Sequence, residues 1–217
     1  MKPIILVNFK TYKEGTGKNA VELAKKLERV SKAYDVELIF AVQAADIHSV
    51  SKAVSVPVYA QHIDAVNYGS NTGFILAEAV KEAGAQGTLI NHSEHQVTME
   101  EIERITKKAK FLGMKTVICA NTPKIGQQVA KFNPDFIAVE PPELIGGRIS
   151  VAEAKPDVIK DAVKLIGNNV LVGAGVNNAD DLRISLKLGA KGILLASAIV
   201  KSELPDTVLK NILRALD

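Results

Sequence analysis

The 217-residue sequence lacks the features of several protein classes. It has one cysteine, Cys119, which excludes an internal disulfide and a cysteine cluster for a metal. The formal net charge is only +3, and no lysine and arginine run is interleaved with aromatic residues, so nothing supports nucleic-acid binding. No apolar run is long enough to cross a membrane, and no regular His and carboxylate cluster suggests a metal site.

The first residues pass directly into a strand pattern, and no small-residue cleavage site of a signal peptide is visible. A single cysteine fits a reducing compartment. We therefore expect a cytoplasmic protein that binds neither nucleic acid nor a membrane.

What the sequence does contain is a repeated strand-then-helix pattern. The strands are continuous apolar runs rather than alternating ones, which is typical of parallel strands covered on both faces. They are predicted at residues 4–7, 37–42, 56–61, 87–91, 116–120, 136–140, 169–172 and 192–195. The repeat of roughly 20 to 35 residues suits βα units.

Helix patterns follow each strand. Thr98 and Glu101 form the signature of a capping box at the start of the fourth helix. Other helices are predicted at residues 19–31, 46–53, 74–83, 125–132 and 205–216. Two more are predicted, one with Pro156 in its first turn and one that ends at Gly189. No linker divides the chain, so residues 1–217 are predicted to form one domain of the α/β class. Eight units favour a (β/α)₈ barrel over an open doubly wound sheet.

The sixth strand delivers one carboxylate to its carboxyl end. Pro cannot donate to a sheet ladder, so the strand stops by Pro141 and Glu140 lies where the chain leaves the core. The following segment has a second proline at Pro142 and a flexible Gly146–Gly147 pair at its far end. This arrangement suits a catalytic base under a movable lid, although a structural Glu on an ordinary connection fits the same pattern.

In a barrel, the residues that end each strand converge on one face. The candidates on that face are Asn8 and Lys10, His92 and Glu94, Glu140, the turn of residues 173–176, and Ala196 with Ser197. Small residues after the seventh and eighth strands can present backbone N–H groups to a phosphate.

Several of these residues also have simpler interpretations. Taken alone, Lys10 is a solvated loop lysine, and His92 is a hydrogen-bonded structural histidine. Glu94 can pair with Lys10 instead of doing chemistry. His95 is interpreted as a surface residue, and Cys119 as a small buried hydrophobe.

Three motifs in order along the chain resemble the triosephosphate isomerase family. They are Asn8-Phe9-Lys10 after the first strand, His92-Ser93-Glu94 after the fourth, and Ala138-Val139-Glu140-Pro141 after the sixth. The resemblance covers nearly the whole chain, and the short length is similar to the archaeal branch of that family. It implies a TIM barrel without a cofactor or metal, which interconverts dihydroxyacetone phosphate and D-glyceraldehyde 3-phosphate in glycolysis and gluconeogenesis.

The resemblance also implies roles for single residues. Glu140 is the base that moves a proton between the carbons flanking the carbonyl, His92 is a neutral electrophile, and Lys10 supplies positive charge. The implied substrate-binding residues are Asn8, Phe9, Lys10, Ile145, Gly175, Ala196 and Ser197. Glu94 is implied to support these residues without contacting the substrate. The loop of residues 64–73, from Asp64 to Gly73, corresponds to the interface loop of a homodimer or homotetramer.

The sequence departs from the more familiar bacterial and eukaryotic pattern in four places. Its lid has Pro142-Glu143-Leu144, the eighth strand ends in Ala196-Ser197 instead of paired glycines, the turn after the seventh strand lacks a serine, and no Glu follows Cys119-Ala120-Asn121-Thr122. Two alternative functions remain open at this point. One is another phosphate-binding barrel enzyme, such as a sugar-phosphate epimerase or aldolase. The other is a non-catalytic barrel that binds a phosphorylated metabolite or acts as a structural subunit.

Overall fold

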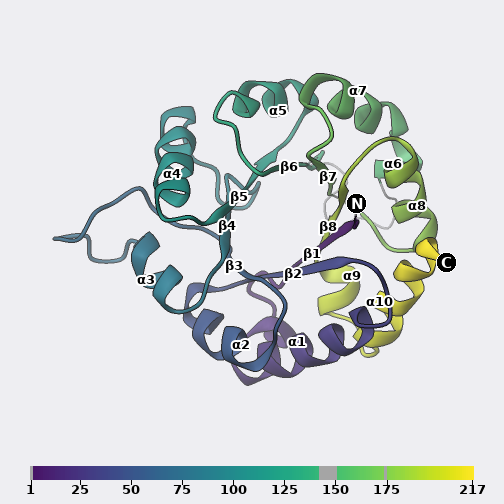
Figure 1. Cartoon of the computed structure of the whole chain (residues 1–217), viewed down its shortest axis with the longest axis horizontal. Helices are drawn as coiled ribbons and strands as arrows, with labels where there is room; N and C mark the ends of the chain where they lie inside the picture. The colour runs from purple at the N-terminus through teal and green to yellow at the C-terminus, as the bar shows by residue number, and fades with distance from the viewer. Residues whose placement is uncertain (1, 142–150, 174) are drawn as a thin grey trace.

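Eight parallel strands close into a barrel in the order of the sequence. The computed structural model describes residues 2–141, 151–173 and 175–217. Figure 1 looks along the barrel and shows the strands at the centre with the helices around them. The strands are β1 (Ile4–Asn8), β2 (Glu37–Val42), β3 (Val58–Ala60), β4 (Gly87–Ile90), β5 (Lys115–Ala120), β6 (Phe136–Val139), β7 (Val170–Val172) and β8 (Gly192–Leu195).

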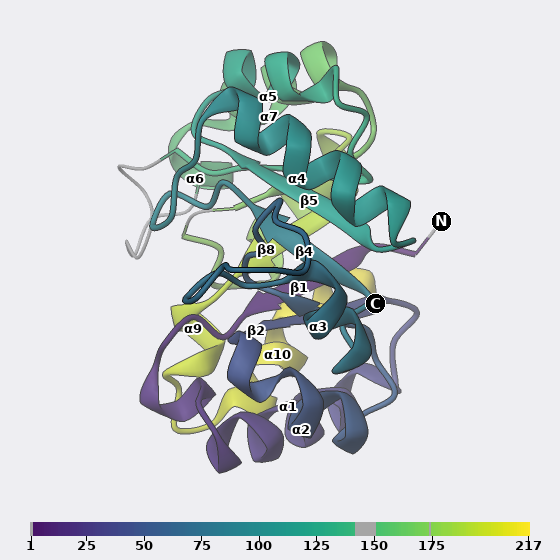
Figure 2. The same ribbon diagram turned by 90° about the vertical axis from the view of Figure 1, so that its left-hand side faces the viewer.

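Helices cover the outside of the barrel, as the side view in Figure 2 also shows. They are α1 (Lys18–Ser31), α2 (Ile47–Ala53), α3 (Ala77–Glu82), α4 (Met99–Phe111), α5 (Pro123–Ala130), α6 (Val151–Ala154), α7 (Pro156–Ile166), α8 (Ala179–Lys187), α9 (Ser197–Val200) and α10 (Pro205–Leu213). Short 3₁₀ turns occur at Lys13–Gly15, Ala44–Asp46 and Arg214–Leu216. Within the described part of the chain, no helix has the length and apolar character that a membrane span requires.

The continuous apolar runs have a direct structural explanation. Each strand is buried on both faces, so successive side chains enter two different cores. On β1, Ile4 and Leu6 belong to the cluster inside the barrel, whereas Ile5 and Val7 pack outward against the helices. The predicted (β/α)₈ barrel is therefore confirmed.

The open sheet is excluded by the pairing of the first and last strands. Ile4 of β1 is in register with Gly192 of β8, which closes the ring. A Cβ at Gly192 would lie 2.0 Å from the carbonyl oxygen of Ile4, so this closure requires glycine. Gly87 begins β4 under similar constraint, because a Cβ there would lie 2.6 Å from the ring of Tyr59.

Most predicted element positions agree with the structure, with differences at the ends. The third strand was predicted at 56–61 but spans Val58–Ala60, and the helix predicted at 125–132 is α5, which begins earlier because Thr122 caps it. The capping box of Thr98 and Glu101 is present at the start of α4. The short helices α6 and α9 were not predicted, because four residues are too few for a helical periodicity.

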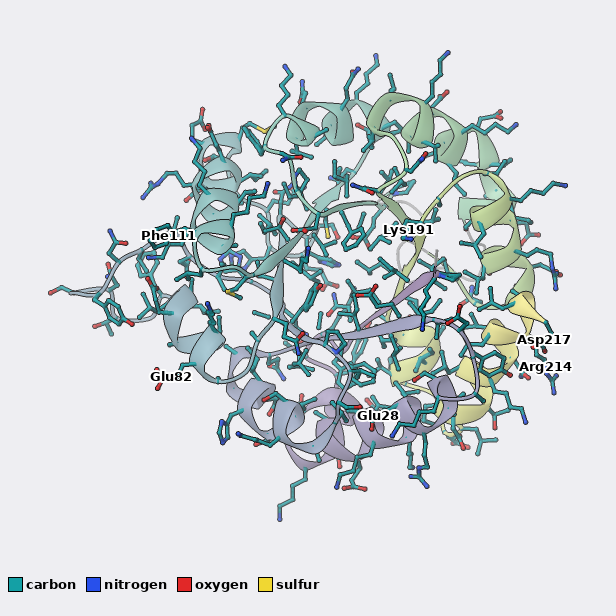
Figure 3. All side chains as sticks on the ribbon, viewed as in Figure 1. Glu28, Glu82, Phe111, Lys191, Arg214 and Asp217 are labelled. Atoms are coloured by element: carbon teal, nitrogen blue, oxygen red, sulfur yellow. The ribbon has the colours of Figure 1, made fainter. Side chains whose placement is uncertain are left out.

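Side chains fill the barrel centre in Figure 3, while the labelled Glu82, Arg214 and Asp217 lie on its outer rim. The longest excursion beyond the helix ring is the loop between β3 and α3, at the left of Figure 1. Its base is closed by backbone and side-chain hydrogen bonds between Asp64 and Ile75. The aromatic residues Tyr68 and Phe74 in this loop are largely exposed.

Candidate active site

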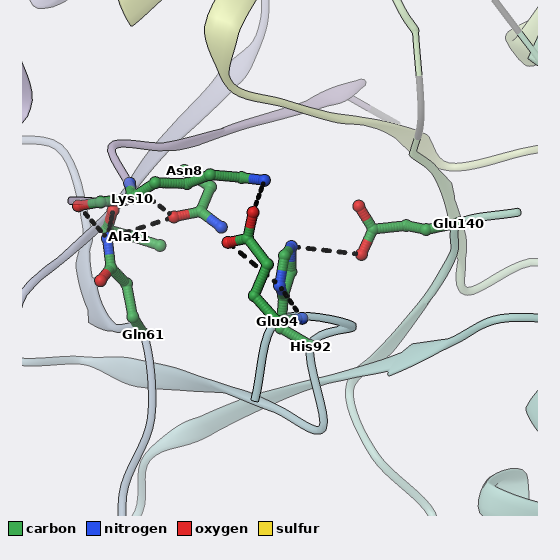
Figure 4. Close-up of polar contacts among 7 residues, drawn as sticks. All are labelled: Asn8, Lys10, Ala41, Gln61, His92, Glu94 and Glu140. Carbon is green, nitrogen blue, oxygen red and sulfur yellow. Dashed lines mark hydrogen bonds and ion pairs between the residues drawn. The ribbon is translucent and has the colours of Figure 1, made fainter. Parts of the chain in front are cut away.

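The carboxyl ends of β1, β4 and β6 bring five of the predicted site residues to one face of the barrel (Figure 4). They are Asn8, Lys10, His92, Glu94 and Glu140. Asn8, His92 and Glu140 are buried, with 3%, 7% and 4% of their surface exposed. Polar groups are rarely buried to this extent without hydrogen-bond partners, so the partners of each one matter.

His92 and Glu140 face each other across a short gap. The His92 Nε2 atom lies 3.8 Å from the Glu140 Oε2 atom, which is too long for a hydrogen bond. Among the residues that the structure describes, neither atom has any hydrogen-bond partner. Such orphaned buried atoms require an explanation. A reactant that lies beside both atoms would contact the imidazole nitrogen and the carboxylate oxygen together.

The tautomer of His92 follows from its other nitrogen. The backbone N–H of Glu94 donates to His92 Nδ1 over 3.2 Å, so Nδ1 accepts and carries no proton. In the neutral ring the proton is then on Nε2, the nitrogen that points to Glu140. His92 is thereby oriented as a neutral hydrogen-bond donor toward the gap.

Glu140 is held by the sheet and by its neighbours. Its backbone N–H donates to the carbonyl of Ala120 over 2.9 Å, which extends the β5–β6 ladder by one residue. A Cβ at Gly173, just beyond β7, would lie 2.3 Å from Glu140 Cγ, so the absence of a side chain there makes room for the carboxylate. Cys119 lies beside it, and burial together with the charge of Glu140 raises the pKa of the Cys119 thiol well above its usual value. Cys119 is the small buried residue that we expected.

Lys10 forms the ion pair with Glu94 that the sequence suggested. Its Nζ lies 2.7 Å from Glu94 Oε1, and only 10% of the Lys10 side chain is exposed. The Lys10 backbone has a φ of 47°, a left-handed conformation that costs an L-residue roughly 1–2 kcal/mol. The side-chain oxygen of Asn8 accepts the backbone N–H of Lys10 over 3.0 Å and supports this turn. Strain of this kind occurs often at functional sites.

The remaining predicted site residues lie in different settings. The strands β7 and β8 pair with each other, so Gly175 on one side and Ala196 and Ser197 on the other follow neighbouring strand ends. Ser197 begins α9, and Gly175 has a φ of 69°. Phe9 is fully buried in the hydrophobic core, with its ring centroid 5.3 Å from that of Phe40. Ile145 and the lid of residues 142–150 lie outside the described residues.

Sequence reasoning missed the residues that follow β3. Gln61 donates hydrogen bonds to the β1 end, and His62 stacks on His95 with ring centroids 4.2 Å apart. His95 is exposed but its ring has this partner, so the surface interpretation was incomplete. The available signal was the polar Gln61 at a strand end, where barrel sites are built.

A cavity of about 630 Å³ opens beside the site. Its lining includes Asn8, Lys10, Gln61, His92 and Glu94. Across the described ranges, no group of three or more His, Cys, Asp or Glu side chains is placed to hold a metal ion.

The fold and these side chains define a class: a (β/α)₈ barrel with a buried carboxylate and a buried imidazole facing each other at the carboxyl ends of the strands. The family model of triosephosphate isomerase matches residues 3–215. The triosephosphate isomerase of Methanobacterium bryantii is 46% identical over 97% of this chain and 95% of its own length. That of Saccharolobus solfataricus is 45% identical over 96% and 94%.

The chain therefore belongs to the triosephosphate isomerase family, as its motifs predicted, and its curated relatives are mostly archaeal. It is an isomerase that interconverts dihydroxyacetone phosphate and D-glyceraldehyde 3-phosphate, a step of glycolysis. A crystal structure of the Bartonella henselae triosephosphate isomerase has the same fold, with a TM-score of 0.74 over 99% of both chains and 19% identity.

Proposed function

We propose that Glu140 is the base of the isomerisation and that His92 is its electrophile. The single observation that carries this proposal is a pair of buried atoms, Glu140 Oε2 and His92 Nε2, which lie 3.8 Å apart and have no hydrogen-bond partner among the described residues. A carboxylate accepts a proton from carbon, and a neutral imidazole N–H stabilises the oxygen that becomes negative. Both groups belong to rigid strand ends, so little reorganisation is needed as charge develops.

The proton balance of the reaction is as follows. The Glu140 carboxylate takes a proton from C1 of dihydroxyacetone phosphate, and the electrons of that C–H bond form the C1=C2 double bond of an enediolate. Negative charge moves to the oxygen on C2, where it receives a hydrogen bond from His92 Nε2–H. A proton then moves from the C1 hydroxyl to the C2 oxygen by way of the imidazole. Glu140 returns its proton to C2, which gives D-glyceraldehyde 3-phosphate without net loss or gain.

Lys10 supplies the positive charge of the site. Its ammonium is nearly buried and is already paired with Glu94, which lowers the cost of holding a cation away from water. Positive charge near the substrate oxygens stabilises both the phosphate and the developing enediolate.

We infer that the phosphate binds to backbone N–H groups at Gly175, Ala196 and Ser197, together with Ile145 of the lid. Adjacent turns after β7 and β8 and the start of α9 support this position. A lid that excludes water would also protect the enediolate, which loses phosphate in open solution.

Replacing Glu140 by Asp tests the assignment of the base. Asp withdraws the carboxylate by about 1.5 Å, the length of one carbon–carbon bond. A misplacement of the reacting group by about 1 Å is enough to lower the rate about 10²-fold. We expect kcat to fall by two orders of magnitude or more, while inorganic phosphate inhibits as before. Near-normal turnover in Glu140→Asp would remove Glu140 from this role.

The alternative functions predict different results. An aldolase needs a lysine that forms a Schiff base, and among the described residues none of the buried polar or charged side chains is a lysine. Borohydride trapping with a ketose phosphate should therefore leave the protein unlabelled. A non-catalytic barrel would bind phosphoglycolate, which resembles the enediolate, no more tightly than inorganic phosphate. We expect phosphoglycolate to bind much more tightly.

We also propose that the protein is a homodimer or homotetramer that works in the cytoplasm, and that residues 64–73 contribute to its interface. The loop projects beyond the helix ring and exposes Tyr68 by 76%, and Phe74, directly after it, is exposed by 57%. Apolar surface of this kind is typical of interaction sites. Phe111 at the end of α4 is 87% exposed and is a candidate for a second contact (Figure 3). The mass in solution should exceed one chain, and Tyr68→Glu with Phe74→Glu should lower it.

A further inference from the structure

Gln61, the residue that directly follows β3, connects three strand ends with one side-chain amide. Its Nε2 lies 3.2 Å from Asn8 Oδ1, 3.0 Å from the Lys10 carbonyl oxygen and 3.3 Å from the Ala41 carbonyl oxygen (Figure 4). Two N–H hydrogens serve these acceptors, so at least one is shared. The Gln61 backbone N–H also donates to Val42 over 3.2 Å. The residue is thus fixed from both ends against β1 and β2.

Two of the three acceptors of Gln61, Asn8 Oδ1 and the Lys10 carbonyl oxygen, define the turn at Lys10. This turn has a φ of 47°, which few L-residues adopt unless their surroundings impose it. Asn8 Oδ1 accepts the Lys10 N–H, and Gln61 donates both to that same oxygen and to the Lys10 carbonyl. Both backbone polar groups of Lys10 are therefore held, one through Asn8 and one by Gln61 directly.

The same bonds orient the amide of Asn8. Because Asn8 Oδ1 accepts from both Lys10 and Gln61, its Nδ2 points away from Gln61 and toward the centre of the site in Figure 4. One side chain thus sets the direction of two groups that border the cavity.

We propose that Gln61 is a positioning residue for the isomerisation, which holds the left-handed turn of Lys10 and directs its ammonium toward the substrate. The inference rests on the proposed role of Lys10. When Gln61 can no longer donate, the Lys10 carbonyl loses its partner and the turn relaxes to an ordinary φ. The ammonium then leaves its position although the ion pair with Glu94 is chemically intact.

Gln61→Met tests this inference, because methionine is close in size but has no donor. We expect kcat/KM to fall by about 10- to 100-fold, as is usual when a site group moves by about 1 Å. The affinity for phosphoglycolate should fall as well. Gln61→Asn keeps an amide but is one methylene too short to reach Lys10, so it should change kcat/KM in the same direction.

Gln43→Met is the matched control. Gln43 lies on the wall of the same cavity, but its Nε2 donates to Thr16 Oγ1 at 2.9 Å and lies 3.4 Å from Asp46 Oδ2, and these bonds do not involve Lys10 or Asn8. The same substitution there should leave kcat/KM within about twofold. A comparable loss in Gln43→Met would indicate a general effect of the cavity wall and would overturn the inference.

A double-mutant cycle separates positioning from a merely structural role. If Gln61 acts through Lys10, then Gln61→Met should weaken phosphoglycolate binding in the wild-type background and have no further effect on binding in a Lys10→Met background. Additive losses of affinity would overturn the inference. If Lys10→Met by itself leaves phosphoglycolate binding unchanged, the proposed role of Lys10 is wrong, whatever Gln61→Met does. A loss in Lys10→Met combined with no loss in Gln61→Met would refute only the role of Gln61.

Discussion

The sharpest test of how Glu140 is placed does not change Glu140 at all. A methyl group at Gly173 would lie 2.3 Å from Glu140 Cγ and 2.8 Å from both Cδ and Oε1. Ordinary contacts between carbon atoms begin at about 3.5 Å, so the Glu140 side chain must move by roughly 1 Å in Gly173→Ala. The contact involves the middle of the side chain, which a small rotation of the carboxylate cannot relieve.

The expected result is a fall in kcat of about 10²-fold, since a displacement of 1 Å in a reacting group has this effect on rate. Overpacking of this kind costs about 1–3 kcal/mol of stability, so the barrel should remain folded at 25 °C. Steady-state kinetics give kcat, inhibition by inorganic phosphate reports on the phosphate site, and chemical denaturation reports on the fold. Inhibition by phosphate should stay within about threefold of wild type.

Gly126→Ala is the control for adding a methyl group in a tight place. A Cβ at Gly126 in α5 would lie 2.5 Å from Ile166 Cδ1, the flexible end of a side chain that lies away from the site. Its kcat should be unchanged. If folded Gly173→Ala also keeps kcat within about twofold, the argument that Gly173 sets the position of the base is wrong. Loss of phosphate inhibition would mean instead that the whole turn after β7 has moved.

Two further predictions concern stability. Burial, more than the neighbouring His95, lowers the pKa of His62, despite a hydrogen bond to Asp64. The unfolded chain thus binds this proton more readily, and the contribution of His62 to stability is present above its ordinary pKa of about 6.5 and is lost as the pH falls below it. Urea denaturation at pH 7.5 and 5.5 should show a smaller pH-dependent loss in His62→Gln than in the wild type, and an equal loss would contradict this. Thr98→Ala removes the capping box with Glu101 and should cost about 1 kcal/mol of unfolding free energy with kcat unchanged, whereas a kcat defect would mean that α4 helps to place the loop of β4.

The sequence predicted the barrel and the three principal polar groups of the site for one physical reason. Parallel strands that are buried on both faces appear in the sequence as continuous apolar runs, and the residue that ends each run must lie at the mouth of the barrel. Pro141 marked the end of β6, so Glu140 could be placed without a structure. Lys10 and His92 follow the ends of β1 and β4 in the same way.

The interactions of Gln61, Cys119 and Gly173 were beyond sequence reasoning. Each depends on contacts between strands that are distant in the sequence, and on side-chain directions that periodicity does not record. Gln61 reaches Lys10 only because β1, β2 and β3 are neighbours in the closed ring. The short helices α6 and α9 were missed because tertiary packing, and not a repeating pattern, forms them.

The unpartnered atoms of the site explain why so regular a barrel is needed. A buried polar group without a hydrogen bond costs about 1–3 kcal/mol, and two such atoms, His92 Nε2 and Glu140 Oε2, lie in the part of the site that the structure describes. A flexible loop would relieve that cost by turning the groups toward each other or toward water. Glu140 cannot do so, because the β5–β6 ladder holds its backbone and Gly173 and Cys119 enclose its side chain. The stability of the closed sheet thus holds this imidazole and this carboxylate 3.8 Å apart, too far for a hydrogen bond between them.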